Sequence, residues 1–228
     1  MTTAQGARAR ARNEVTAAIK EEARRQLAAD GAVKLSLRAV ARELGMVSSA
    51  LYRYFPSRDE LLTALIIDAY DALGAAAEKA REDAGDAPPA ACFTAVCEAV
   101  RAWALAHPHE YALIYGSPVP GYAAPETTIP AAARTGMVLI GIFRDAQQGP
   151  GLAELPLPDE LRPEAERLAA DLAPDLTPEV AAALVAAWAQ LFGLVSFELF
   201  GQFNNVIEDR ERFFRYAATG LAHGAGLG

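Results

Sequence analysis

The sequence is poor in the residues that build disulfide, metal and covalent-catalysis sites. Its 228 residues include two cysteines and three histidines. Two cysteines are too few for a disulfide framework. Cys92 and Cys97 are five positions apart, so on a helix they would lie on different faces and out of bonding distance. We therefore expect reduced thiols and a cytoplasmic location.

Recognisable catalytic and cofactor motifs are also missing, because no glycine-rich phosphate loop and no nucleophile elbow occur. The segment HPHE (107–110) offers two imidazoles and a carboxylate, but a metal needs three or four convergent ligands and the proline suits a helix start. On one helix, His107 would lie about three or four turns from the cysteines, too far for a nucleophile pair. We predict no catalytic residues, no metal and no cofactor. An α-helical enzyme acting through His107, His109 or the cysteines stays an alternative.

No membrane-targeting segment is evident. The first residues, MTTAQGARARARN, are basic but lack the apolar run of a signal peptide. The 18 residues from Val180 to Phe197 carry no charge, which is the lower limit for crossing a bilayer. This run is rich in alanine and glycine, is bounded by Glu179 and Glu198, and has no flanking lysine or arginine anchor. We predict no membrane contact, and a helix buried in protein instead.

Alternating strand patterns are absent, while helical spacing of apolar residues recurs along the whole chain. Hydrophobic residues make up 52% of the sequence, enough for a sizeable core. We predict an all-α fold: an N-terminal three-helix bundle with a helix-turn-helix, plus a larger helical ligand-binding and dimerisation domain. The helices are expected near residues 15–30, 36–44, 48–54, 57–82, 90–106, 108–116, 131–147, 159–173, 178–203 and 209–221.

Charge is distributed unevenly between the two ends of the chain. The net charge of −8 alone would argue against nucleic acid. Residues 1–60, however, hold 11 Lys and Arg against 7 Asp and Glu, a balance of +4, and residues 61–228 carry −12. A basic segment followed by an acidic one favours phosphate binding by the first part only. We therefore predict a DNA-binding domain over 1–60 and a regulatory domain over 61–228.

The basic part contains two short helices separated by a tight turn. Ser36 can cap the first, whose apolar face is Leu37, Val40, Ala41 and Leu44, and Gly45 can end it in the left-handed conformation. In the second helix, Val47 and Leu51 would face the core. This is the helix-turn-helix layout, in which the second helix enters the major groove. The side chains left to point outward, at least in part, are Ser48, Ser49, Ala50, Tyr52, Arg53 and Tyr54.

Hydroxyls and arginine are ordinary donors to DNA phosphates, and small residues allow close approach to base edges. The amides at Ser36 could also meet a phosphate. After Pro56, the sequence SRDE (57–60) is a capping box that predicts the start of a long connecting helix. Arg8, Arg10 and Arg12 form a basic arm that could add DNA contacts or be a disordered tail.

The segment LSLRAVARELGMVSSALYRYFPSRDELL (35–62) resembles the DNA-binding signature of the TetR family of bacterial transcriptional regulators. The resemblance covers about residues 10–65 and includes Gly45, Leu51, Tyr52, Tyr54, Phe55, Ser57, Arg58 and Leu61. It implies that Tyr52 and Tyr54 face DNA and that Arg58 meets a phosphate. The serine that usually opens the recognition helix is Val47 here, so its cap must shift or be absent. Ser48 and Ser49 occupy variable positions, so no operator sequence follows.

The segment WAQLFGLVSFELFGQF (188–203) is similar to the Trp-His-Gly motif of one subgroup of TetR C-terminal domains, with Phe192 in place of the histidine. The resemblance implies that C-terminal helices pair two subunits into a four-helix bundle and that the other helices enclose a small-molecule pocket. Small residues at Ala182, Ala186, Ala189 and Gly193 would suit such an interface or an intrachain core.

Candidate ligand contacts are aromatic or soft side chains of the regulatory part, each of which could equally be core. They are Trp103, Tyr111, Tyr115, Tyr122, Met137, Phe143, Trp188, Phe192 and Phe197. Together these features predict a homodimeric, ligand-responsive DNA-binding regulator. It would be a repressor that leaves a palindromic double-stranded DNA operator when a small apolar or amphipathic molecule binds. A dimeric helical scaffold without DNA function is the other alternative.

Overall fold

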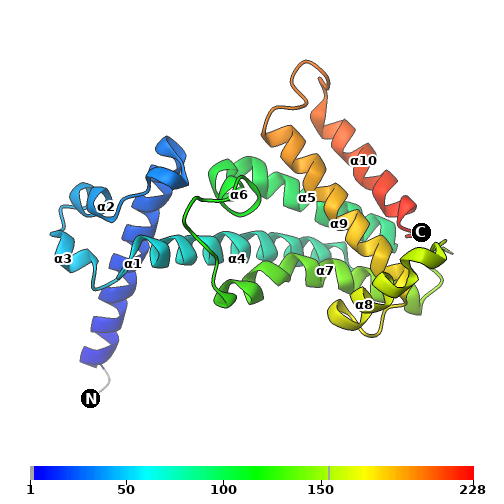
Figure 1. Ribbon diagram of the computed structural model, residues 1–228, viewed down its shortest axis with the longest axis horizontal. Helices are drawn as coiled ribbons and strands as arrows, with labels where there is room; N and C mark the ends of the chain where they lie inside the picture. Colours follow the sequence, from blue (N-terminus) through cyan, green and yellow to red (C-terminus); the bar gives the residue numbers. More distant parts are fainter. Residues whose placement is uncertain (1–2, 154) are drawn as a thin grey trace. The chain divides into compact units, whose positions relative to one another are not determined.

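The computed structural model describes residues 3–153 and 155–228 (Figure 1), and over these residues the fold is all-α with no strand, as predicted. Three short 3-10 helices accompany the α-helices: η1 (Ala32–Lys34), η2 (Glu126–Thr128) and η3 (Asp159–Leu161). The α-helices are α1 (Thr3–Asp30), α2 (Leu37–Glu43), α3 (Ser48–Leu51), α4 (Arg58–Ala84), α5 (Pro89–Ala106), α6 (Pro108–Tyr115), α7 (Ile129–Gln148), α8 (Arg162–Leu172), α9 (Pro178–Leu199) and α10 (Arg210–Gly224).

The chain forms two compact units. The head unit comprises the chain up to Tyr70 together with His107–Ile129, and the body unit comprises Asp71–Ala106 and Pro130–Gly228. The helix α4 contributes to both, and α6 with the loop that follows it belongs to the head unit. Packing thus divides the chain differently from the boundary between residues 60 and 61, which concerns function and stays a prediction.

The head unit is built around apolar side chains from its first four helices. Ile19 of α1, Val40 of α2, Leu51 of α3 and Leu61 of α4 have no exposed surface. The helices α2 and α3 are only seven and four residues long, too short to be stable alone, so this shared core holds them. Leu113, Val119 and Tyr122 add a second layer from α6 and its loop; all three are partly buried against the same core.

The basic arm is helical. The first helix begins at Thr3, well before the expected start near residue 15, so Arg8, Arg10 and Arg12 lie on its initial turns. All three side chains are exposed. The alternative of a disordered tail is therefore wrong for the described part of the arm.

Turn and capping chemistry sets the boundaries of the helix-turn-helix. The Ser36 hydroxyl accepts from the Ala39 amide at 3.4 Å and caps α2, and Gly45 follows with φ 64°, the left-handed conformation that glycine adopts without strain. At α4, the Ser57 hydroxyl accepts from the Glu60 amide at 3.1 Å, as the capping box predicts. The third helix ends at Leu51, earlier than the predicted Tyr54.

In the body unit, a buried ion pair joins three helices. The Arg101 guanidinium of α5 donates to both carboxylate oxygens of Glu198 on α9, at 2.7 and 2.6 Å. The exposed fractions of the two side chains are 16% and 5%. The same guanidinium lies over the Phe214 ring of α10, 5.4 Å from its centroid, so this one group ties α10 to α5 and α9.

A second arginine joins α7 to α4 within the body unit. Arg134 donates to both oxygens of Glu78, at 2.8 and 2.6 Å, and to the side chain and carbonyl of Asp71. Its side chain crosses Gly74 so closely that an added Cβ there would lie 2.6 Å from the Arg134 Cβ. Gly74 is therefore required by packing, although its position in the sequence suggests no turn.

The charge-free run forms α9, which is long and apolar enough to cross a membrane by length and composition alone. It packs instead against α5, α8 and α10, and its terminal residue pairs Glu179–Arg162 and Glu198–Arg101 are ion pairs within the chain. These contacts are those of a core helix, as the sequence predicts.

We expect Glu198→Ala to lower the free energy of unfolding by about 3 kcal/mol, because it leaves the Arg101 guanidinium buried without its partner. Urea denaturation at fixed protein concentration measures the change. The control is Lys79→Ala, which removes an exposed pair with Asp83 and should not change stability measurably. Equal effects of the two variants would contradict a dominant role for Arg101–Glu198.

Candidate nucleic-acid interface and ligand cavity

The third helix presents a polar surface made of residues that the sequence selects. Ser48, Ser49 and Arg53 are exposed, and Tyr52 is 42% exposed. Leu51, on the opposite side, is fully buried and fixes this orientation. The helix can therefore bring hydroxyls and one guanidinium to a partner surface without uncovering the core.

Val47 does not face the core, so that prediction is wrong. Its side chain is 69% exposed. Val47 occupies the N-cap position with extended backbone angles, φ −70° and ψ 138°, and makes no side-chain cap. The helical spacing from Leu51 fails because Val47 lies just before the first turn. The sequence did correctly suggest that the usual cap is absent.

Tyr54 is half-buried and follows α3 rather than lying on it. The guanidinium of Arg12, on α1, lies 5.3 Å from the centroid of its ring. The arm and the reading helix thus meet through a cation–π contact, which nothing in the sequence signalled. A positive group is held at the edge of the α3 surface as a result.

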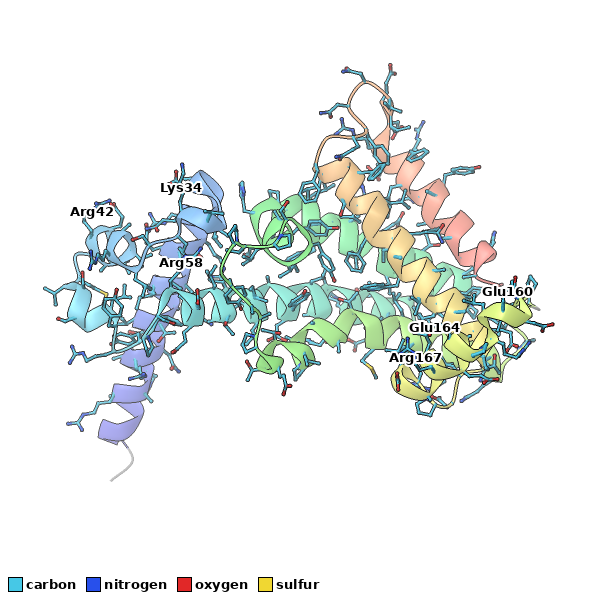
Figure 2. The ribbon with its side chains drawn as sticks, viewed as in Figure 1. Lys34, Arg42, Arg58, Glu160, Glu164 and Arg167 are labelled. Atoms are coloured by element: carbon cyan, nitrogen blue, oxygen red, sulfur yellow. The ribbon has the colours of Figure 1, made fainter. Side chains whose placement is uncertain are left out.

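Arg58 is engaged inside the head unit. Its Nη2 donates to the Ala32 carbonyl at 2.7 Å and the Val33 carbonyl at 3.4 Å, while its Nε donates to the Leu35 carbonyl at 3.2 Å. Its side chain is 30% exposed and also pairs with Asp59. The guanidinium therefore fastens the segment before α2 to the start of α4, whether or not it also meets a phosphate. Figure 2 labels Arg58 together with Lys34 and Arg42 of the same unit.

The segment around Ser36 is also held by a buried carboxylate. Glu22, 3% exposed, pairs with Arg25 and accepts from the Gln26 amide, whose oxygen accepts from the Ser36 amide at 3.5 Å. Ser36 itself is half-buried, and its hydroxyl is occupied as the helix cap. A phosphate contact here would have to use backbone amides.

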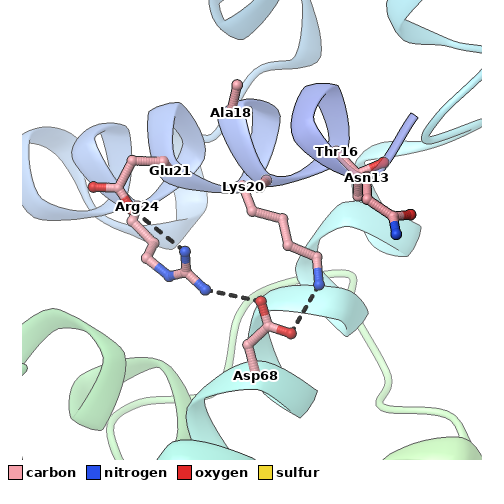
Figure 3. Close-up of a pocket in the computed structure, with 8 residues that line it drawn as sticks. Asn13, Thr16, Ala18, Lys20, Glu21, Arg24 and Asp68 are labelled. Carbon is pink, nitrogen blue, oxygen red and sulfur yellow. Dashed lines mark hydrogen bonds and ion pairs between the residues drawn. The ribbon is translucent and has the colours of Figure 1, made fainter. Parts of the chain in front are cut away.

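A charged cluster joins α1 to α4 and α6 (Figure 3). Asp68 accepts from Lys20 and from Arg24, each at 2.8 Å, and Arg24 Nε lies 3.2 Å from Glu110 of the HPHE segment. These residues border a solvent-open hollow of about 620 Å³. Its cations are matched by carboxylates, Glu21 included, so it offers no net positive charge to a phosphate. The four-residue spacing of Lys20 and Arg24 was visible in the sequence, but their partners were not.

Sites for metal or thiol chemistry are not formed by the described residues. These contain no group of three or more His, Cys, Asp and Glu that could hold a metal ion. Both cysteines are buried, and burial raises the pKa of the Cys97 thiol far above its ordinary value. A thiolate nucleophile is thereby disfavoured.

Comparison with known proteins agrees with this geometry. Residues 19–65 match the family model for bacterial regulatory proteins of the tetR family, and residues 93–221 match the tetracyclin repressor-like C-terminal domain. The chain is 41% identical over 205 residues to the HTH-type transcriptional regulator Rv1816 of Mycobacterium tuberculosis, covering 87% of this chain and 86% of that protein.

Two solved structures are similar over nearly the whole chain. The regulatory protein SCO4313 has a TM-score of 0.79 at 34% identity, covering 94% of this chain and 98% of that one. A protein from Rhodococcus sp. RHA1 has a TM-score of 0.71 at 24% identity, covering 92% and 94%.

The chain belongs to the TetR family. It is a transcriptional regulator with a DNA-binding helix-turn-helix, and not an enzyme. Regulators of this family bind DNA operators and dimerise.

The predicted ligand residues of this TetR protein fall into both units. In the head unit, Tyr111 and Tyr115 stack at 5.2 Å between centroids, and the Tyr122 hydroxyl lies 2.8 Å from that of Thr63. Burial raises the pKa of Tyr115 well above its usual range, which keeps the phenol neutral. Tyr122 packs against the head core, so its contacts are those of a structural residue.

In the body unit, Phe143 packs edge to face on Phe93, and Trp188 packs on Phe192 at 5.8 Å between centroids. Trp103 and Phe192 are buried, Met137 and Phe197 are more than half exposed, and Trp188 is 42% exposed. Trp188 also lines a cavity of about 180 Å³ between α7, α8 and α9, and every lining residue is apolar or glycine. These residues are Gly136, Leu139, Ile140, Leu172, Leu184, Val185 and Trp188. Sequence reasoning missed the aliphatic ones, because aliphatic side chains on helices resemble ordinary core.

We expect Arg58→Ala to lower the free energy of unfolding by about 2 kcal/mol, since it removes charged hydrogen bonds to three carbonyls. Arg58→Lys should recover part of the loss, because an ammonium cannot span all three acceptors. The control is Arg53→Ala, an exposed arginine of the same unit. If Arg58→Ala lost DNA affinity at unchanged stability, the guanidinium would be a phosphate contact alone.

Proposed function

We propose that the protein is a ligand-responsive repressor that acts in the cytoplasm as a homodimer on a palindromic double-stranded DNA operator. The DNA contacts are assigned to Ser48, Ser49, Tyr52, Arg53 and Tyr54, with Ser36 amides and Arg58 at the edge. The observation that carries this assignment is the outward polar face of α3, held by buried Leu51. Arg12 over Tyr54 extends the same surface to α1.

The homodimer is assigned to α9 and α10. Along α9, Ala186 and Ala189 are exposed, Ala182 and Gly193 are half-buried, and Phe197 is 52% exposed. These positions recur at helical spacing and form one uncovered face of small and apolar residues. Tyr216 on neighbouring α10 is 77% exposed. Such a face fits a second copy of the chain, and a two-fold dimer presents two reading helices to two half-sites.

The effector is assigned to the cavity between α7, α8 and α9. An apolar cavity of about 150 Å³ can hold benzene, so one of about 180 Å³ suits a small apolar group or the apolar part of an amphipathic molecule. A ligand that prefers one arrangement of the helices shifts the dimer between states of different DNA affinity. Release of the operator would then relieve repression.

The DNA surface is tested by salt dependence. We expect Arg53→Ala to weaken binding to DNA of the protein's own promoter and to reduce the slope of log affinity against log salt by about 1. The matched control is Arg167→Ala on α8, an exposed arginine of the body unit that pairs with Glu164 and Asp171 (Figure 2). Fluorescence anisotropy at several salt concentrations measures both. A scaffold without DNA function would show no salt-dependent binding in any form.

The effector cavity is tested by filling it. A Cβ added at Gly136 or at Gly141 meets no heavy atom within 4 Å, and only the first of these two glycines lines the cavity. We expect benzene to shift the methyl resonances of Leu139, Leu184 and Val185 saturably, Gly136→Leu to abolish the shifts, and Gly141→Leu to retain them. Operator affinity without benzene should be the same in both variants. Unchanged benzene binding in Gly136→Leu would exclude this cavity.

A further inference from the structure

The head unit contains a cavity of its own, formed where α1 and η1 meet α6. Its volume is about 200 Å³. The lining is mainly apolar, and Val33, on its wall, is 65% exposed although it is a large aliphatic residue. The residues that line it are Leu27, Gly31, Ala32, Val33, His109, Ala112, Leu113, Ser117, Pro118 and Val119.

One wall of this cavity is the segment that Arg58 holds. Ala32 and Val33 line the cavity with their side chains, and their carbonyl oxygens accept hydrogen bonds from the Arg58 guanidinium. The same guanidinium binds the Leu35 carbonyl, one residue before the Ser36 cap of α2. A molecule that pushes on η1 therefore acts, through one side chain, on both the entry to α2 and the start of α4.

The opposite wall carries the two polar side chains of the cavity. His109 and Ser117 are both exposed, and both can donate and accept hydrogen bonds. The cavity lining contains no lysine or arginine, and Glu110, next to His109, pairs with Arg24. The chemistry thus favours a neutral ligand with one hydrogen-bonding group over a carboxylate or a phosphate. The volume is sufficient for a single ring.

We propose that this cavity is a second effector site, in the head unit, that binds neutral single-ring compounds carrying one hydroxyl group. The ring lies against Leu27, Val33 and Leu113, and the hydroxyl reaches His109 or Ser117. Occupancy separates η1 from α6, strains the Arg58 contacts and lowers DNA affinity. The effect on DNA rests on the proposed function, whereas binding of the compound does not.

Phenol is the probe, with an expected Kd on the order of 1 mM for so small a molecule. In the full-length protein with labelled Leu and Val methyl groups, phenol should shift the resonances of Leu27, Val33, Leu113 and Val119 saturably. Ala112→Phe fills the cavity and should abolish these shifts. His109→Ala, an exposed position that should not impair folding, should weaken phenol binding while leaving any shifts caused by benzene unchanged.

The matched control is Gly136→Leu, which fills the body-unit cavity and should leave the phenol shifts of Val33 and Leu113 unchanged. The methyl resonances of Leu139 and Leu184 report whether each head-unit variant is folded. No saturable shift at Val33 and Leu113, or equal shifts in wild type and Ala112→Phe with native body resonances, would overturn the site.

Coupling to DNA is measured separately. Saturating phenol should weaken promoter binding about fivefold in wild type and Gly136→Leu, and should have no effect in Ala112→Phe. By reciprocity, DNA should weaken phenol binding by the same factor. Phenol binding without any change in DNA affinity would overturn the regulatory role of the site. Absence of DNA binding in phenol-free protein would instead contradict the proposed function.

Discussion

The geometry of the reading head depends on the attachment of two very short helices to the rest of the head unit. Helices of seven and four residues do not persist alone, so α2 and α3 take their positions from Leu51 and Val40 in the common core and from Arg58 at its edge. Arg58 binds carbonyls that precede α2 while it opens α4. The residue thus links the DNA-binding surface to the helix that continues into the body unit.

Charged groups have a corresponding structural role in each unit. In the head unit, Asp68 receives Lys20 and Arg24, so α1 and α4 are joined by partly buried ion pairs. In the body unit, Arg101 and Glu198 do the same for α5 and α9 with less exposure to water. The acidic character of residues 61–228 is therefore only partly a solvated surface. Some of its carboxylates are fixed by arginines, which leaves the exposed basic groups of the head available to a polyanion.

The two cavities differ in chemistry in a way that suits different ligands. The cavity around Trp188 is lined by apolar residues and glycine, whereas the one beside η1 has His109 and Ser117 on one wall. An apolar molecule gains most in the first, because nothing there rewards a polar group. A hydroxyl-bearing ring can satisfy both halves of the second. Regulation through two chemically distinct sites would let one operator respond to two classes of compound.

The sequence by itself determined the elements of this protein and the class to which it belongs. Apolar spacing predicted the helices, Ser36, Gly45 and Ser57 predicted their ends, and the LYRYF segment indicated the family. These signals are local, since a cap or a turn depends on a few neighbouring residues. Only the tertiary structure decided which side chains meet over long separations. It placed Val47 outside the core, put Arg12 over Tyr54, tied Arg58 to Ala32, and made a cavity from aliphatic residues that in sequence look like core. Such contacts join residues far apart in the chain, and helical periodicity fixes a residue's face without naming what packs against it.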